Sequence, residues 1–166
     1  ARRLAAALRL PEDVGNAVTA ALQWHDLGKD RGVWQAAIGN NDYASGTALA
    51  KSGGQMRPAL LNSYRHELGS LLDIAKTHAD QLDALPATQR DLVLHLIAAH
   101  HGRARPHFPA DESFDPKHAV EACLATLQGV SMRFGHLQAS TGRWGLAWLE
   151  AIVRAADAIA SQSEEA

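Results

Sequence analysis

The chain has 166 residues with a net charge of −2, and 46% of its residues are hydrophobic and 20% are charged. These values exclude a largely disordered chain and a strongly basic nucleic-acid clamp. The single cysteine, Cys123, excludes an intrachain disulfide and is expected to be a small buried hydrophobe. The apolar stretches are too short to span a bilayer, so we predict a cytoplasmic protein without a membrane partner.

Strand patterns are scarce in this Ala- and Leu-rich sequence, so we predict an all-α fold. The four tryptophans, Trp24, Trp34, Trp144 and Trp148, are expected in the core rather than on a base-stacking surface. We expect one domain over residues 1–166, whose first helix, or part of it, precedes Ala1. Long loops are expected over 39–58, which should be mobile, and over 102–116. Apolar spacing, caps and breakers predict helices over residues 1–9, 11–27, 32–38, 65–78, 89–100, 117–133 and 143–161.

Histidine is abundant, with nine residues, and with one cysteine only histidine and carboxylate remain as protein ligands for a transition metal. Three of four polar strings directly follow an apolar helical stripe and should face the interior, where an unpaired charge is costly. A metal site would satisfy such groups together, and an aspartate can bridge two cations. The four strings are His25-Asp26-Leu27-Gly28-Lys29, Arg65-His66-Glu67, His100-His101-Gly102 and Ala156-Asp157-Ala158.

Each string also has a plainer explanation. The first pair could cap a helix, with Lys29 as a surface charge, and His66 could be an ordinary first-turn residue. The double histidine could face solvent at a helix C-terminus, where the helix dipole favours a positive charge. Asp157 could be a buried acid that pairs with Arg154. We favour metal ligation because the four strings occur together.

The order of these motifs resembles that of the HD phosphohydrolase superfamily. A His-Asp pair with a following Gly-Lys comes first, then a distant His, a His-His-Gly and a late Asp. HDLGK, RHELGSL and AAHHGRARPHF are similar to the HD nuclease domain of the CRISPR-associated type I effector nuclease–helicase, in its type I-U (also called I-G) variant. The resemblance extends over about residues 18–161. It departs at one point, because no histidine precedes His25, whereas the family has a metal-binding histidine in an earlier helix; we expect that residue upstream of Ala1.

The resemblance implies a helical bundle with a metal site between its helices. It implies an enzyme that hydrolyses phosphodiester bonds of single-stranded DNA, as an endonuclease or exonuclease, in CRISPR interference. A helicase domain, fused or separate, and an RNA-guided surveillance complex would be its partners. Two divalent ions (Mn, Ni, Fe, Co or Mg) would be the cofactors. The implied roles are a bridging Asp26, His25 and Asp157 on one metal, His66, His100 and His101 on the other, and Lys29 beside the scissile phosphate.

The loop after the double histidine is a candidate nucleic-acid contact, since Arg103 and Arg105 match phosphate and His107 lies beside them. Two other functions remain open. One is an HD phosphohydrolase acting on deoxynucleoside triphosphates or cyclic nucleotides, which should enclose its ligand in a pocket. The other is a catalytically impaired HD domain that serves as a docking module. The remaining histidines, His78, His95, His118 and His136, are expected to have surface or packing roles.

Overall fold

The computed structural model describes residues 2–51 and 54–163, so residues 1, 52–53 and 164–166 of the predicted domain lie outside the described residues. Within those ranges the chain is an all-α bundle of eight α-helices and four short 3-10 helices without a strand, which confirms the predicted fold class. None of the described helices combines the length and apolarity needed to cross a bilayer. The elements are α1 (Arg2–Ala7), α2 (Glu12–Trp24), η1 (Leu27–Lys29), α3 (Gly32–Ala37), η2 (Tyr43–Ser45), η3 (Pro58–Leu61), α4 (His66–Thr77), α5 (Ala79–Asp83), α6 (Ala87–Ala99), η4 (Ala110–Glu112), α7 (Val120–Thr141) and α8 (Arg143–Ser163).

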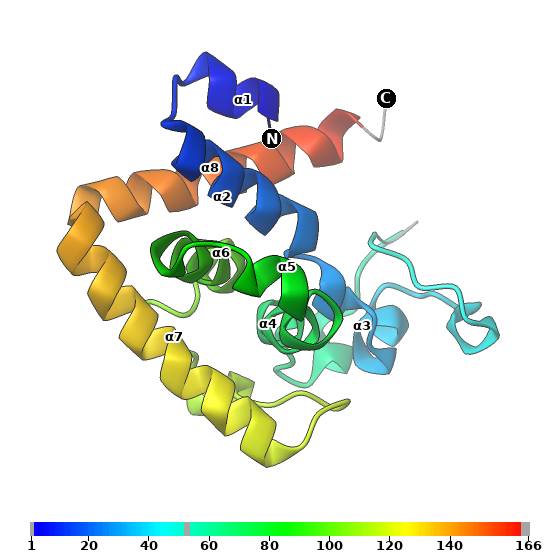
Figure 1. Cartoon of the computed structure of the whole chain (residues 1–166). Coiled ribbons are helices and arrows are strands. Elements are labelled where there is room, and N and C mark those ends of the chain that lie inside the picture. Colours follow the sequence, from blue (N-terminus) through cyan, green and yellow to red (C-terminus); the bar gives the residue numbers. More distant parts are fainter. Residues whose placement is uncertain (1, 52–53, 164–166) are drawn as a thin grey trace.

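The bundle is built around α6. Helix α2 packs along α6, α4 contacts α6 and η1, and the long helices α7 and α8 meet at a corner and both contact α6 (Figure 1). Their apolar faces form one buried cluster, in which Cys123 lies as predicted. Burial of this cluster supplies the main driving force for the fold. Its most deeply buried members include Val18, Ala21, Leu68, Ile74, Val93, Leu96, Ile97, Val130, Leu146 and Val153.

The end of α2 differs from the prediction. The α-helix ends at Trp24 rather than near Leu27, and η1 follows after His25 and Asp26. Helix α4 takes over the hydrogen bonds at this break, because the Ser70 hydroxyl donates to the His25 carbonyl (2.6 Å) and accepts from the Gly28 amide (2.9 Å). A β-carbon at Gly28 would overlap the α4 backbone. Gly28 is therefore required for close approach of η1 to α4, and not simply as a helix stop.

Helix α7 runs from Val120 to Thr141, well past the predicted end at Arg133. Gly135 lies inside it with open space where a side chain would be, so it weakens the helix without ending it. Gly142, with φ of 78°, ends it instead. Helix α5 and the 3-10 turn η2 in the predicted loop over 39–58 were not anticipated.

Three of the four tryptophans are not in the core, and one of these, Trp34, is half-buried outside the apolar cluster. Trp24 is buried as predicted, but Trp144 is 89% exposed and Trp148 is 49% exposed. The two exposed rings lie one turn apart on the outer side of α8, and the inner side is filled by Leu146, Leu149 and Val153. The core prediction for Trp144 and Trp148 was wrong because their spacing fits both faces of an amphipathic helix.

Candidate metal centre

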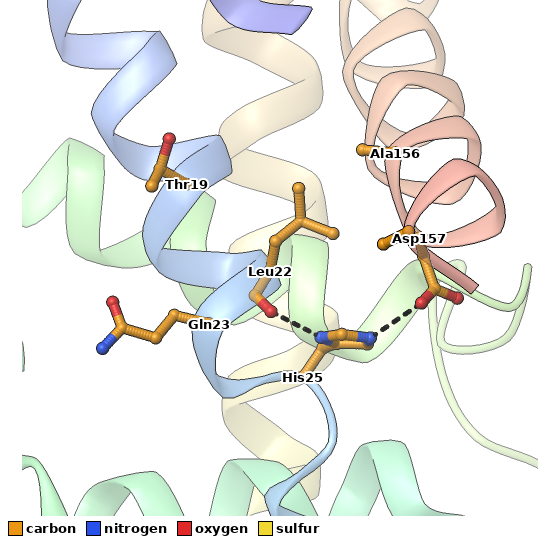
Figure 2. Close-up of a pocket in the computed structure, with 7 residues that line it drawn as sticks. Thr19, Leu22, Gln23, His25, Ala156 and Asp157 are labelled. Atoms are coloured by element: carbon orange, nitrogen blue, oxygen red, sulfur yellow. Dashed lines mark hydrogen bonds and ion pairs between the residues drawn. The ribbon is translucent and has the colours of Figure 1, made fainter. Parts of the chain in front are cut away.

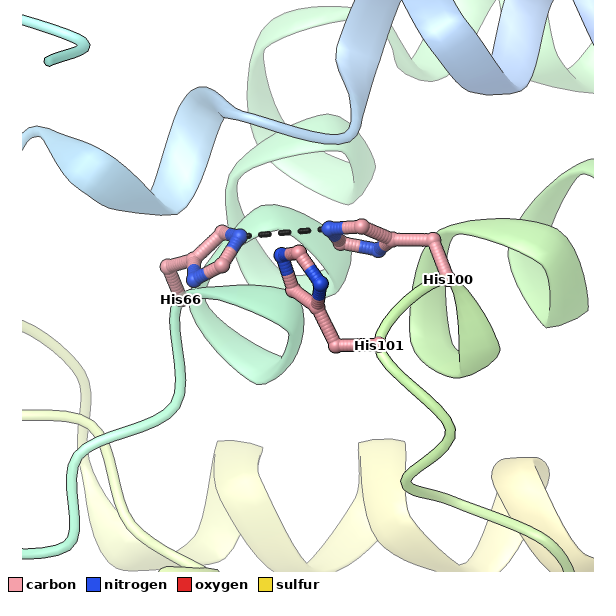
Figure 3. Close-up of side chains that lie close together, drawn as sticks. All are labelled: His66, His100 and His101. Atoms are coloured by element: carbon pink, nitrogen blue, oxygen red, sulfur yellow. Dashed lines mark hydrogen bonds between the residues drawn. The ribbon is translucent and has the colours of Figure 1, made fainter. Parts of the chain in front are cut away.

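Three histidine rings meet where α4 begins and α6 ends. His66 is the first residue of α4, and His100 and His101 directly follow the last residue of α6 (Figure 3). The Nε2 atoms of His66 and His100 are 3.2 Å apart, and both residues are buried. The ring of His101 packs at 4.1 Å from that of His100 and at 5.2 Å from that of His66, and this residue is exposed. The three rings each offer a nitrogen to one small space.

A second group adjoins the first where α2 ends and α8 passes. His25 Nε2 lies 3.2 Å from Asp157 Oδ1 of α8 (Figure 2). Asp26 Oδ1 lies between the groups, 3.4 Å from His25 Nε2 and 3.6 Å from His66 Nε2. All six predicted ligands are therefore brought together, with Asp26 where a bridging carboxylate would be. Asp157 faces His25, and not the alternative partner Arg154, which is exposed.

The donor set fits divalent cations. His25 Nδ1 lies 2.8 Å from the Leu22 carbonyl and His100 Nδ1 lies 2.7 Å from the Ile97 carbonyl, which assigns the proton to Nδ1 and a lone pair to Nε2 in each ring. Asp26 Oδ1 is buried and has no hydrogen-bond partner within the described part of the chain. Two ligand atoms about 2.1 Å from one ion and about 90–110° apart are separated by roughly 3.0–3.4 Å. The observed spacings of 3.2 to 3.6 Å match this range or slightly exceed it.

Three of the imidazoles, those of His66, His100 and His101, have lowered pKa values that favour the neutral form. Burial, reinforced by the neighbouring histidine, lowers the pKa of His66 well below its ordinary value. Burial and the adjacent His101 lower the pKa of His100 to about 3, and desolvation of the His101 ring where it packs against the other two rings lowers the pKa of that residue. Neutral imidazoles are the form that binds metal. The C-terminal ends of α2 and α6, with their partial negative charge, also favour a cation here.

These pKa shifts predict that the metal-free protein loses stability in acid. The unfolded chain protonates His100 near pH 6.5, whereas the folded chain does so only near pH 3. The unfolded state therefore binds the extra proton between these values, and the stability present above pH 6.5 falls as the pH decreases. We expect His100 alone to lower the free energy of unfolding by about 2 kcal/mol between pH 7 and pH 5. Urea unfolding in EDTA at both pH values measures this loss.

The variant His100→Gln isolates the contribution of that ring, and its free energy of unfolding should depend less on pH than that of the wild type. His136→Gln, which changes an exposed histidine of α7, should retain the wild-type pH dependence. An unchanged pH dependence in His100→Gln would contradict the assignment.

Glu67 is a residue to which the sequence analysis gave no role. Its side chain is 1% exposed, Oε2 lies 3.4 Å from His66 Nδ1, and neither carboxylate oxygen has a hydrogen-bond partner within the described residues. Burial raises the pKa of this carboxyl. A carboxylate behind a ligating histidine orients the ring and increases its basicity. In the sequence, the one indication of this role is that Glu67 directly follows His66. The contact to His66 Nδ1 could not be predicted, because it depends on the backbone conformation at the start of α4.

We expect Glu67→Gln to weaken Mn²⁺ binding by about 10- to 100-fold, the usual effect of removing a carboxylate behind a histidine ligand. Calorimetric titration of the metal-free protein with MnCl2 measures the affinity. Glu12→Gln, at an exposed glutamate in the first turn of α2, is the matched control and should bind as the wild type does. Equal affinities for Glu67→Gln and the control would exclude the supporting role.

A buried polar network holds η1 in place. The Arg31 side chain, 1% exposed, bonds both oxygens of Asp115 through Nε (2.9 and 3.1 Å) and both oxygens of Asp73 through its terminal nitrogens (2.9 and 3.0 Å). The Tyr64 hydroxyl donates to the Gly28 carbonyl at 2.7 Å. The network ties the segment after Asp26 to α4 and to the chain before α7, so it fixes the backbone from which Asp26 and Lys29 extend.

Three of the remaining predicted site residues have carboxylate partners. Lys29 Nζ lies 2.7 Å from Asp26 Oδ2 and 5.2 Å from the centre of the Trp34 ring, at the edge of the cluster. Arg103 Nη2 lies 3.4 Å from Glu112 Oε1, and Arg105 Nε lies 3.1 Å from Glu150 Oε1. A phosphate would therefore compete with these carboxylates for the two guanidinium groups. His107 is exposed in the same loop.

Together these contacts define an all-α bundle with a histidine and aspartate cluster where α2, α4, α6 and α8 meet. Comparison with protein-family models, with curated proteins and with solved structures finds no match to the chain. The functional assignment consequently depends on the geometry of the cluster and on the sequence motifs that form it.

Proposed function

We propose that the chain is a metal-dependent phosphohydrolase of the HD type. In this proposal it is a nuclease that hydrolyses phosphodiester bonds of single-stranded DNA in CRISPR interference. The observation that carries the proposal is the convergence of residues distant in sequence. Asp157 and His25 are 132 positions apart, and His66 and His100 are 34 apart, yet each pair has ligand atoms at 3.2 Å. Chance helix caps or surface histidines would not be expected to meet in this way.

Each residue has a role in the proposed reaction. His66, His100 and His101 would hold one divalent ion, His25 and Asp157 a second, and Asp26 would bridge them. When bound, such ions supply Lewis acidity and activate a water at neutral pH. Lys29 keeps Asp26 Oδ2 engaged, which directs Oδ1 toward the histidines, and its ammonium group adds positive charge beside the phosphate position.

The charge of the chain bears on its proposed partners. With a net charge of −2, it lacks the excess of cations that gives tight binding to the nucleic-acid backbone. We therefore infer that a helicase domain, fused or separate and recruited by an RNA-guided surveillance complex, delivers the strand. The inference predicts weak, salt-sensitive DNA binding by the chain alone.

A cleavage assay tests the proposed function. The chain is incubated with end-labelled single-stranded DNA, duplex DNA or RNA, with MnCl2 or with EDTA. Cleavage of the single strand that requires the metal supports the proposal. Metal-loaded protein that leaves all three polymers intact contradicts it.

One observation favours a second candidate, an HD phosphohydrolase acting on small nucleotides. A pocket of about 300 Å³ adjoins His25 and Asp157, and small-molecule sites start at about this size. Release of phosphate or pyrophosphate from deoxynucleoside triphosphates, without cleavage of DNA, would support this candidate over the nuclease.

A further inference from the structure

The pocket beside the cluster lies between α2 and α8. Leu22 and Thr19 of α2 form one wall, Ala156 of α8 lies opposite, and His25 with Asp157 closes the end toward the histidines (Figure 2). Ala160 of α8 also lines the pocket. The lining also includes Gln23. The His25 residue is 8% exposed, so the pocket reaches from an exposed rim at Ala160 to a buried polar group.

The pocket exists because the inner face of α8 changes residue size along its length. The stripe begins with buried large residues, among them Leu149 and Val153, and continues at helical spacing with Ala156 and Ala160. These small side chains leave an apolar space open between α2 and α8. Leucine at the two alanine positions would fill it. The unfilled space opens where α8 presents Asp157 to His25.

We propose that this pocket binds one nucleoside unit, a base with its sugar, next to the phosphate position at the metal-ligand cluster. Three features point to this occupant: apolar walls suited to a flat heteroaromatic ring, a volume at the lower limit of ligand pockets, and direct continuity with His25 and Asp157. The Thr19 hydroxyl already donates to the Gly15 carbonyl at 2.9 Å. The exposed Gln23 amide is the other polar side chain of the walls, and because it can both donate and accept, deoxyadenosine and thymidine should bind with similar affinity. Only the assignment of the neighbouring phosphate position rests on the proposed function.

A titration followed by nuclear magnetic resonance tests the pocket without metal or phosphate. The ¹⁵N-labelled full chain in EDTA is titrated with deoxyadenosine, with thymidine and with 2-deoxyribose. We expect saturable amide shifts at Leu22, His25 and Ala156 with either nucleoside and none with the sugar. If neither nucleoside gives saturable shifts with the wild-type chain, the proposal is overturned.

Two variants of α8 provide the matched comparison. Ala160→Phe places a ring in the pocket and should weaken deoxyadenosine binding at least about tenfold, the loss typical when a few atoms no longer fit an apolar pocket. Ala158→Phe adds the same ring at an exposed position of the same helix outside the pocket and should retain wild-type affinity. Equal nucleoside affinities for the two variants would also overturn the proposal.

The outcome can be separated from that of the proposed function. Binding of deoxyadenosine by a chain that neither binds Mn²⁺ nor cleaves DNA would contradict the metal-dependent enzyme and support the pocket. Metal-dependent cleavage by a chain that gives no nucleoside shifts would support the enzyme and overturn the pocket.

Discussion

Replacing Asp26 with alanine is expected to reduce cleavage of single-stranded DNA at least about a thousandfold, because stabilisation of the reacting phosphate by the metal site is worth several kcal/mol. Among the described residues, Asp26 Oδ1 is the one carboxylate oxygen that lies close to Nε2 of both His25 and His66, at 3.4 and 3.6 Å. Its loss would leave the two proposed ion positions without their shared ligand. Initial rates with saturating MnCl2, for Asp26→Ala and the wild type, measure the effect.

Asp83→Ala is the matched control for this change. Asp83 lies at the end of α5, and its side chain is 71% exposed. Its ion-pair partner is Arg90, which is not part of the cluster. The control should cleave at the wild-type rate, and both variants should retain the far-ultraviolet circular dichroism of a helical protein. Undiminished cleavage by folded Asp26→Ala would refute the role of this residue.

Replacing Arg31 with methionine is expected to lower the free energy of unfolding by about 3–5 kcal/mol, the usual cost of removing one partner of a buried ion pair. Methionine preserves much of the apolar stem but leaves Asp115, whose side chain is fully buried, and the nearby Asp73 without their cation. Burial raises the pKa of Asp115, but the hydrogen bonds from His118 and the Lys117 amide, together with the Arg31 guanidinium, hold it below its ordinary value. Urea denaturation at pH 7 measures the loss.

Arg90→Met tests whether the effect depends on burial. Arg90 forms an ion pair with Asp83 at 3.1 Å in an exposed setting, so its replacement should cost less than about 1 kcal/mol. Equal losses for the two variants would contradict the structural role of the Arg31 network.

Local patterns predicted seven of the eight described α-helices, α5 being the exception, and the identity of the clustered residues. The stripe that ends in His25 and the stripe that ends in His100 placed both side chains at helix ends, and the structure has them there. Apolar periodicity predicts such positions because it depends on neighbours three and four residues away. The prediction that His25, His66, His100 and Asp157 belong together came from the resemblance, since no local rule relates residues so far apart.

The supporting residues were not predicted, because their partners are distant in sequence. Arg31 meets Asp73 and Asp115, which are 42 and 84 positions further along the chain. The buried partner of His95 is Glu150, at 2.7 Å and 55 positions away. Trp144 and Trp148 do lie on one face of α8, as their spacing predicted, but it is the exposed face. The sequence could not decide between the two faces, because the choice depends on how α6 and α7 pack against α8.

Anomalous X-ray scattering from crystals grown with MnCl2 tests the metal centre most directly. We expect a manganese peak about 2.1 Å from Nε2 of both His66 and His100, the distance typical of metal–imidazole bonds. A second peak is expected about 3.5–4 Å from the first, beside His25 and Asp157, with Asp26 between the two. Crystals that bind manganese elsewhere, or show no peak among the four histidines, would contradict the proposed site.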